Sequence, residues 1–333
     1  MKLSLFSTLR GYRKEYLPKD IFSGIIIAAV SIPISMGYAQ ISGIPAVYGL
    51  YGSVLPILLF ALFSTSRQFI FGVDAAPAAI VGGALSTLSI AAESEAAMDY
   101  VPAIALFAGL WLFIFFLLHA DKIVDFISTP VMGGFISGIA VTIILMQIPK
   151  LMGSPAGSGE LLELTEHIFA AAKNISWLSL FMGLGTLVLI RTFKKLAPKF
   201  PMAIVIMALG VLSTIVFHVD EKGVVLLQSV ERGLPSLMIP DFGNVDLTQA
   251  AGRGLMVAVV IMAETLLAEN TFAFRNDYKL NDRQEILACA AGNIAAAAVG
   301  CCPVNGSISR TSLNEQYGGK SQAVSITAGI TML

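Results

Sequence analysis

Two short stretches of this chain decide its fold: FGVDAAP at residues 71–77 and CCPVNGSISRT at residues 301–311. Each places glycine, proline and polar residues inside long apolar surroundings, and each precedes a segment able to form a short helix. Backbone that is not helical inside a bilayer leaves amide and carbonyl groups unpaired, so it is tolerated only where protein buries it or a wet cavity lines it. The stretches therefore predict two broken helices at membrane depth. Simple kinks at Pro77 and Pro303 are the alternative.

The composition is that of a membrane protein. Hydrophobic residues make up 56% of the 333 residues and charged residues only 13%, whereas a soluble domain carries roughly 25% charged residues. A bilayer core of about 30 Å needs roughly 20 mostly apolar residues per helix. Such segments lie near residues 21–43, 47–64, 74–91, 101–118, 124–148, 175–191, 201–218, 253–274 and 283–300, followed by a broken element at 306–316 and an apolar run from 321. The pattern predicts an all-α polytopic membrane protein whose surroundings are the lipid bilayer.

Several other classes of function lack support in the sequence. The net charge of −1 argues against a nucleic-acid partner. The three cysteines, Cys289, Cys301 and Cys302, form no CxxC pair and have no histidine at ligand spacing. We therefore expect no metal site and no cofactor, apart from a coupling ion. Without a nucleophile–base pair in view, we do not expect an enzyme.

The basic residues predict the orientation. If the N-terminus is cytoplasmic, fifteen Lys and Arg residues fall in segments on the cytoplasmic side and five fall outside. Positive residues concentrate in cytoplasmic loops. The 91–100 loop holds three acidic residues and no basic one, which fits the outside. We expect a multi-pass protein of the inner (plasma) membrane with a cytoplasmic N-terminus.

The two broken segments stand in corresponding positions of two halves of the chain. They interrupt the third and tenth predicted elements, and because this offset of seven is odd, the second half would be inserted upside down. Two half-helices would then meet near the midplane with both N-termini pointing at one place. Free N–H groups and positive dipole ends make that place attractive to an anion.

Ionisable residues at membrane depth are the next candidates, because a charge at the bilayer centre costs at least about 2.5 kcal/mol. Arg310 would supply a fixed positive charge suited to an oxyanion, or would be a structural partner for Asp74 or Glu264. Glu264 would carry a proton or a coupling ion, or would simply bond to a neighbouring helix. Glu269 lies nearer the cytoplasmic end and is ambiguous. Tyr38 would face the cavity or the membrane interface.

With these residues in view, the chain resembles the SulP (sulfate permease) family of anion transporters, relatives of pendrin and prestin. The strongest match is PVNGSISRTSLN at residues 303–314, close to the family's PVTGSFSRTAVN run. Further matches are IPAVYGLY at 44–51, SRQ at 66–68, GVDA at 72–75 and STPVMGGF at 128–135. These motifs occur in the order in which the family has them.

The resemblance implies an inverted-repeat fold of seven plus seven transmembrane helices with core and gate domains. Residues 1–333 would be the transport domain, with a first repeat at about 15–218 and a second, incomplete repeat at about 250–333. We interpret the chain as truncated after ten to eleven elements, without the family's STAS domain. The assembly would be compatible with a homodimer.

The family's site lies between the third and tenth helices and is touched by the first and eighth. Position by position, the resemblance assigns two sets of residues. The substrate-binding set is Tyr38, Ala75, Ser307, Ile308, Ser309 and Arg310. The set for coupling to protons or sodium is Glu264 and Asp74.

The leading hypothesis is secondary active transport of a small inorganic anion of the sulfate, bicarbonate, chloride or dicarboxylate class. It would proceed by proton or sodium symport or by anion exchange, with alternating access around the midplane site. One alternative is a nucleobase–cation symporter of the same fold, a family that favours acidic residues in both the eighth and tenth helices, where this chain has Arg310. The other is a membrane scaffold or motor that does not transport.

Overall fold

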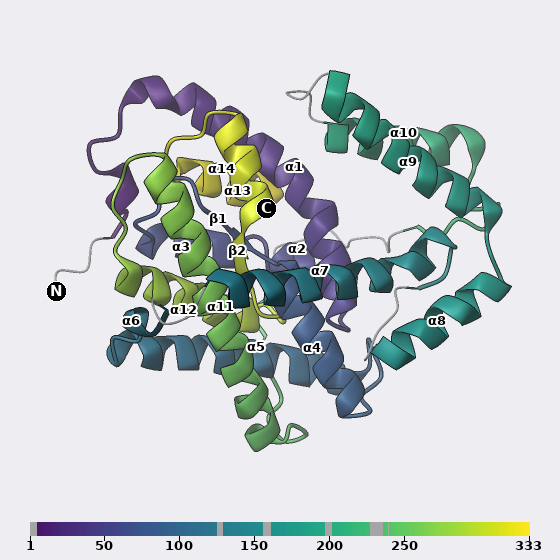
Figure 1. Ribbon diagram of the computed structural model, residues 1–333, viewed down its shortest axis with the longest axis horizontal. Coiled ribbons are helices and arrows are strands. Elements are labelled where there is room, and N and C mark those ends of the chain that lie inside the picture. Colours follow the sequence, from purple (N-terminus) through teal and green to yellow (C-terminus); the bar gives the residue numbers. More distant parts are fainter. Residues whose placement is uncertain (1–4, 125–128, 156–160, 197–201, 227–235, 239) are drawn as a thin grey trace. The chain divides into compact units, whose positions relative to one another are not determined.

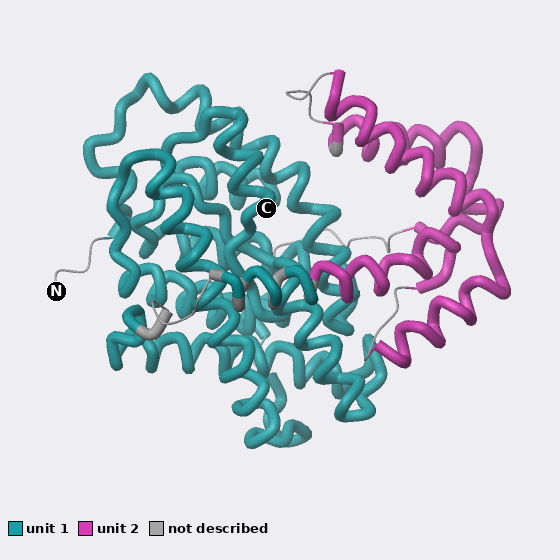
Figure 2. The backbone as a smooth tube through the Cα atoms, in the orientation of Figure 1, with its two compact units in different colours: residues 1–139, 231–333 teal, residues 140–230 magenta. Residues whose placement is uncertain are grey.

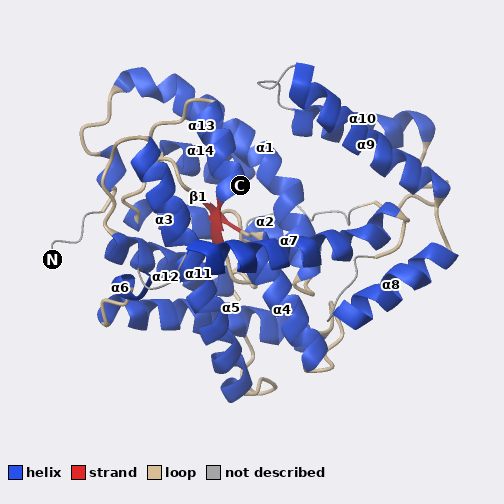
Figure 3. Cartoon of the chain, viewed as in Figure 1, coloured by secondary structure: helices blue, strands red, loops and turns tan. Residues whose placement is uncertain are grey.

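The computed structural model describes residues 5–124, 129–155, 161–196, 202–226, 236–238 and 240–333. It is mainly helical, with two short strands at its centre (Figures 1 and 3). The first part of the chain forms α1 (Leu17–Ile41), α2 (Ala46–Tyr51), α3 (Leu55–Phe63), β1 (Ile70–Gly72), α4 (Ala75–Thr87), α5 (Glu95–Leu117) and α6 (Asp121–Val124). The middle forms α7 (Thr129–Leu151), α8 (Leu161–Lys173), α9 (Trp177–Leu196) and α10 (Met202–Phe217). The last part forms α11 (Leu247–Arg275), α12 (Asp282–Ala298), β2 (Asn305–Ser307), α13 (Ile308–Gln316) and α14 (Ala323–Met332).

The chain divides into two units, residues 1–139 with 231–333 and residues 140–230 (Figure 2). The first unit takes elements from both ends of the sequence and contains both broken segments. The second contains α8, α9, α10 and the later part of α7, and within it α9 contacts α10. The expected fold with core and gate domains also predicts two units.

Contacts inside the first unit come in mirrored pairs. Helix α1 packs on α14 as α11 packs on α5, and α3 packs on α14 as α12 packs on α5. Helix α1 contacts α13 as α11 contacts α4. These pairs relate α1 to α11, α3 to α12, α4 to α13 and α5 to α14, and this is the relation between two inverted repeats. The boundaries of the repeats stay a prediction.

Helical stretches long and apolar enough to cross a membrane number five among the described residues: Lys14–Ile41, Ala46–Phe63, Glu95–Leu117, Trp177–Leu196 and Leu247–Arg275. Shorter apolar helices lie at Ala75–Thr87, Ala140–Leu151, Ile204–Phe217 and Ala323–Met332. The short helix at Ala75–Thr87 confirms the interrupted third element, since it covers little more than half a span.

The span expected at 47–64 is confirmed as the helical stretch Ala46–Phe63, which contains α2, a turn at residues 52–54 and α3. Gly52 in this turn packs directly on Cys301: a Cβ at residue 52 would lie 2.2 Å from that Sγ. Two other predicted boundaries were wrong. The 149–174 connection contains α8, whose acidic residues hide it from a search for apolar runs. For the span expected at 124–148, the structure has α6, which ends at Val124, and then α7 from Thr129 to Leu151; residues 125–128 lie outside the described part.

The sequence did not predict that the two breaks pair as strands. Strands β1 and β2 are antiparallel, with Ile70 opposite Ser307, Phe71 opposite Gly306 and Gly72 opposite Asn305. In Figure 3 the pair crosses the middle of the helices. Because each strand supplies hydrogen-bonding partners to the other, backbone that leaves the helical path is satisfied inside the protein.

Polar side chains complete the pairing of this backbone. Asn293 of α12 donates from Nδ2 to the Val304 carbonyl (3.0 Å) and accepts from the Val304 N–H at Oδ1 (3.0 Å). Asn314 donates to the Gln68 carbonyl (2.8 Å). Gln322 donates to the carbonyls of Ser66 (2.8 Å) and Phe69 (2.9 Å). These side-chain amides pair the backbone groups that precede each strand.

Aromatic packing fixes β1 between its neighbours. The rings of Phe71 and Phe60 of α3 stack with centroids 4.4 Å apart. On the other side, Phe71 lies against Gly292 of α12, where a Cβ would come within 2.4 Å of the ring. The bare glycine backbone therefore creates the space that this ring fills.

Replacing Asn293 by alanine tests the role of this amide. Asn293→Ala leaves a buried N–H and a buried C=O of Val304 without partners, and each unsatisfied group costs about 1–3 kcal/mol. We expect a clear drop in the melting temperature of the purified protein in detergent. Asn244→Ala, at an exposed position of the loop before α11, serves as the control and should melt like wild type; equal melting of both variants would contradict this role.

Candidate anion-binding site

The starts of α4 and α13 come together beside the strand pair. Each helix begins within three residues of its strand, α4 at Ala75 and α13 at Ile308. Arg310, in the first turn of α13, donates from Nη2 to the Val73 carbonyl just before α4 (2.8 Å). The side chains of Ser307 and Asp74 lie close enough to influence one another electrostatically. The two half-helix N-termini predicted from sequence are thus neighbours.

Arg310 is the unusual group of this site. Its side chain is 2% exposed, and it is among the largest fully buried side chains of the protein. Besides the bond to Val73, its Nε has no hydrogen-bond partner among the described residues. The ion pair found in the described part of the chain joins Arg275 and Glu315, so Arg310 has no acid at contact distance. A buried charge left without such compensation costs several kcal/mol.

Glycine makes room for this guanidinium. A Cβ at Gly72 would lie 3.0 Å from Nη1 of Arg310, closer than a side chain normally comes to a fixed group. Gly72 has a φ of +157°, on the side that favours glycine. The close approach of Arg310 therefore explains why glycine suits the first position of the GVDA motif at residues 72–75.

The other predicted residues surround the guanidinium at different depths. Asp74, Ala75 and Tyr38 are half-buried, and Tyr38 lies close enough to Asp74 and Arg310 to interact electrostatically with both. On the first turn of α13, Ile308 (42% exposed) and Ser309 face outward, whereas Ser307 is buried. The Ser307 and Ser309 hydroxyls lie 3.3 Å apart.

Asp74 already occupies the start of α4. Its Oδ1 accepts a hydrogen bond from the Ala75 N–H (2.8 Å). An anion bound at this N–H would have to displace the carboxylate, because both seek the same donor and repel each other. The Ala75 N–H is therefore already paired in this structure.

Glu264 is set to one side of the helix starts and is bonded to β2. Its Oε2 accepts from Asn305 Nδ2 (2.7 Å). The neighbouring Thr265 hydroxyl donates to Asn305 Oδ1 (2.6 Å) and accepts from the Gly306 N–H (3.3 Å). The alternative foreseen for Glu264 was a bond to a neighbouring helix, whereas the bond that the structure shows goes to a strand. Thr265 and Asn305 were missed, although a polar residue beside Gly306 in the break was a visible signal for Asn305.

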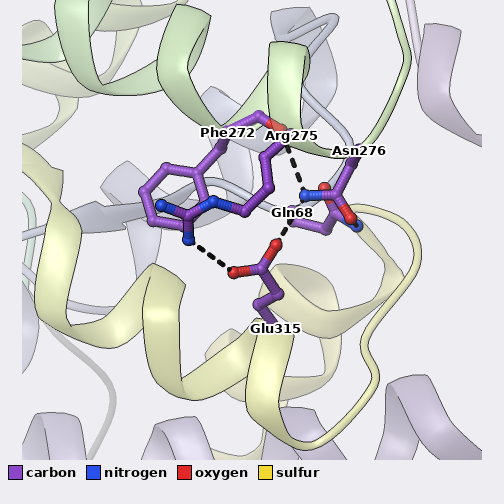
Figure 4. A network of polar contacts seen from close by, with 5 residues as sticks. All are labelled: Gln68, Phe272, Arg275, Asn276 and Glu315. Carbon is purple, nitrogen blue, oxygen red and sulfur yellow. Dashed lines mark hydrogen bonds and ion pairs between the residues drawn. The ribbon is translucent and has the colours of Figure 1, made fainter.

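The far end of α13 is also fixed to α11. Glu315 accepts from Asn276 Nδ2 (2.6 Å) and pairs with Arg275 (3.1 Å), and Gln68 donates to Asn276 (3.1 Å), as Figure 4 shows. The Arg275 guanidinium lies 5.3 Å from the centre of the Phe272 ring. The short helix is held at both ends, so its N-terminus keeps a fixed direction.

No group of three or more His, Cys, Asp or Glu side chains able to hold a metal ion occurs in the part of the chain that the structure describes. What the site offers is a fixed positive charge, two helix starts and hydroxyl groups, a combination that suits an oxyanion.

An inverted-repeat helical membrane protein with two half-helices facing a buried arginine belongs to the class of secondary transporters and related permeases. The model described as "Sulfate permease family" matches residues 17–333, and the chain belongs to this family.

Two curated relatives illustrate the similarity. The "Probable sulfate transporter MT1781" of Mycobacterium tuberculosis (strain CDC 1551 / Oshkosh) is 27% identical over 319 residues, which are 96% of this chain and 57% of the relative. "Sulfate transporter 4.1, chloroplastic" of Arabidopsis thaliana is 29% identical over 337 residues, 98% of this chain and 48% of the relative. The chain thus spans about half the length of these relatives.

Solved structures show the same fold. The transmembrane domain of the cyanobacterium bicarbonate transporter BicA superimposes with a TM-score of 0.84 at 20% identity, over 97% of this chain and 83% of that one. The murine Slc26a9 anion transporter in the inward-facing state gives 0.85 at 18% identity, over 98% and 57%. The expected fold class is confirmed by these matches.

Replacing Thr265 by valine tests the link between α11 and β2. Thr265→Val keeps the shape but leaves Asn305 Oδ1 and the Gly306 N–H without their hydroxyl partner, a loss of about 1–3 kcal/mol. We expect a lower melting temperature in detergent. Thr271→Val, on an exposed position of the same helix, removes only a local bond to Leu267 and should leave melting unchanged. An unchanged melting temperature for both would show that the link is not stabilising.

Proposed function

We propose that this chain carries the site for secondary active transport of a small inorganic anion. The observation that supports this most is Arg310, buried at the start of α13 without an acid at contact distance. A permanent positive charge in such surroundings favours a mobile anion as its partner. The positive ends of α4 and α13 act in the same direction.

The substrate class follows from the donors and from the relatives. Arginine, hydroxyl groups and helix N-termini bind oxyanions well. Two relatives are named as sulfate transporters, and one structural neighbour is titled a bicarbonate transporter. Sulfate is therefore our first substrate, with bicarbonate, chloride and dicarboxylates as competitors.

The coupling would involve Asp74 and Glu264. Both carboxyls lie near the helix starts, and an anion repels a bare carboxylate there. Binding of a proton or a sodium ion at these groups would remove that repulsion and so link the anion to a cation gradient. Alternating access would then carry the site from one side of the plasma membrane to the other, with the N-terminus on the cytoplasmic side. A homodimer is compatible with this function.

The deciding experiment is uptake of radiolabelled sulfate into proteoliposomes. Saturable uptake that bicarbonate or other small anions reduce, and that uracil does not, supports anion transport. Uptake of uracil itself would favour the nucleobase symporter. A folded, correctly inserted protein that takes up neither would favour a scaffold or motor.

Arg310→Ala should weaken anion binding. A Coulomb interaction of about 4 kcal/mol at 4 Å, with an effective dielectric constant near 20, is the upper limit of the loss. Water and helix N–H groups compensate partly, so we expect a smaller loss in sulfate affinity, measured by titration of the purified protein.

The control for this substitution is Lys279→Ala, because Lys279 is a basic residue at an exposed position of the loop between α11 and α12. Arg310→Lys, which keeps the charge but not the fork of donors, should lie between wild type and alanine. Wild-type affinity in a folded Arg310→Ala protein would assign Arg310 to structure alone.

Glu264→Gln separates coupling from substrate binding. Glutamine still bonds to Asn305 but cannot ionise, so anion exchange should persist while uptake driven by a pH or sodium gradient is lost. Both activities are measured on one proteoliposome preparation. If gradient-driven accumulation survives in Glu264→Gln and disappears in Asp74→Asn, Asp74 is the coupling group instead.

A further inference from the structure

A second pair of carboxyl groups lies on α11 and α12, separate from the residues around Arg310. Glu269 and Glu285 are each 0% exposed. Their side chains are within hydrogen-bonding distance of one another. Glu269 lies one helical turn beyond Thr265, towards the end of α11 that leads to Tyr278. The proposed transport mechanism uses neither carboxyl.

The two carboxyls have very different partners. Glu285 accepts hydrogen bonds from the Ser64 hydroxyl at Oε2 (2.7 Å) and from the Thr65 N–H at Oε1 (2.5 Å). The Thr65 hydroxyl also donates to Oε1. Glu269, by contrast, receives no hydrogen bond at either oxygen from any described donor.

This asymmetry decides which group holds a proton. Hydrogen bonds to a carboxylate favour its charged form, so three donors stabilise Glu285 as the anion. Two adjacent buried carboxylates repel each other and also lose their hydration. A proton on Glu269 removes the repulsion and turns Glu269 into a donor to Glu285, which explains why no other donor reaches it.

The ion pair found among the described residues, Arg275 with Glu315, involves neither Glu269 nor Glu285. Asp282 and Cys289 of α12 and Tyr278 of the connecting loop face the pair. Tyr278 lies outside the membrane-spanning helices, and its burial raises its pKa to about 12, so it stays a neutral phenol. The Cζ atom of Arg67 lies over this ring, 5.4 Å from its centre.

We propose that Glu269 and Glu285 together bind a single proton as an acid–carboxylate pair, at a site distinct from the anion site. The ligand is the proton, carried by Glu269 and shared with Glu285. The shared proton links α11 to α12. Through the bonds of Ser64 and Thr65 to Glu285, it also links both helices to the loop that leads into β1. Since Thr265 bonds to β2 from the adjacent turn of α11, the proton site supports both strands of the central pair.

The test is the pH dependence of melting of the 333-residue chain in detergent. While the folded state holds a proton that the unfolded chain has released, the folding equilibrium constant falls about tenfold per pH unit as pH rises. We expect the wild type to melt at lower temperature as the pH is raised from acidic to alkaline. Glu269→Gln mimics the neutral acid and still donates to Glu285, so the decline should become shallower by the contribution of this one proton.

Two further variants test whether Glu269 binds a proton or only contributes to packing. Glu285→Gln should melt lower at every pH, because Ser64 and Thr65 lose a charged acceptor. Glu95→Gln, at an exposed position of α5, should behave like wild type. The proposal is overturned if Glu269→Gln keeps the wild-type decline or loses as much stability as Glu285→Gln. It is also overturned if sodium restores alkaline stability in the wild type but not in Glu269→Gln, since the pair would then hold a metal cation.

Infrared spectroscopy keeps the proposal testable even if Glu269→Gln does not fold. In the Glu264→Gln chain with isotope-labelled glutamate, a protonated glutamic acid band should persist at neutral pH and resist deuterium exchange. Absence of that band overturns the proposal. None of these measurements uses transport, so their outcome is independent of the proposed function.

Discussion

The structure depends on the rule that backbone groups at membrane depth must find partners inside the protein. Two stretches of the chain leave the helical path, and each satisfies the other as one strand of an antiparallel pair. Three amide side chains, Asn293, Asn314 and Gln322, satisfy the backbone groups that flank the strands. Once this pairing exists, two helices start beside it, and the positive ends of both helix dipoles lie in the same region.

Electrostatics at this region follow from that geometry. Two helix starts and a buried guanidinium all contribute positive potential, and the half-buried Asp74 offsets it only partly. Gly72 is needed because Arg310 reaches across the strand pair to the Val73 carbonyl. A second buried pair, Glu269 of α11 and Glu285 of α12, lies apart from this region, and Glu285 accepts hydrogen bonds from Ser64 and Thr65. Thr265, one turn before Glu269 on α11, bonds to Asn305 and Gly306 of β2.

Much of this arrangement was predictable from the sequence because membrane depth imposes strict rules. Apolar length predicted the helices, the glycine and proline breaks predicted α4 and α13, and the spoiled helices with a buried charge pointed to Arg310, Asp74 and Glu264. Pairing of β1 with β2 was not predictable in this way. Three-residue strands carry no periodic pattern, and their partners are far apart in sequence. The role of Asn305 and the link to Thr265 depend on that pairing, so they could not be derived before it was known.

Other misses have local causes. Helix α8 is amphipathic and acidic, so a search for apolar runs passes over it. Gly52, between α2 and α3, packs on Cys301 of a distant segment, a contact that a search for apolar runs does not predict. The partner of Glu269 was out of reach because Glu285 lies in a different helix, and only the packing of α11 on α12 brings the carboxyls together.

The pairing of the two breaks also has a consequence for how the protein is made. Val73 and Arg310, which bond across the pair, are 237 positions apart in the chain. At synthesis rates of about 5–20 residues per second, β1 must wait on the order of ten to fifty seconds for its partner. During that interval the first break is a strand without a neighbour at membrane depth. Its unpaired groups would be met by water, lipid head groups or an insertion chaperone, so the nascent chain should stay in a protected environment until the ribosome has delivered β2.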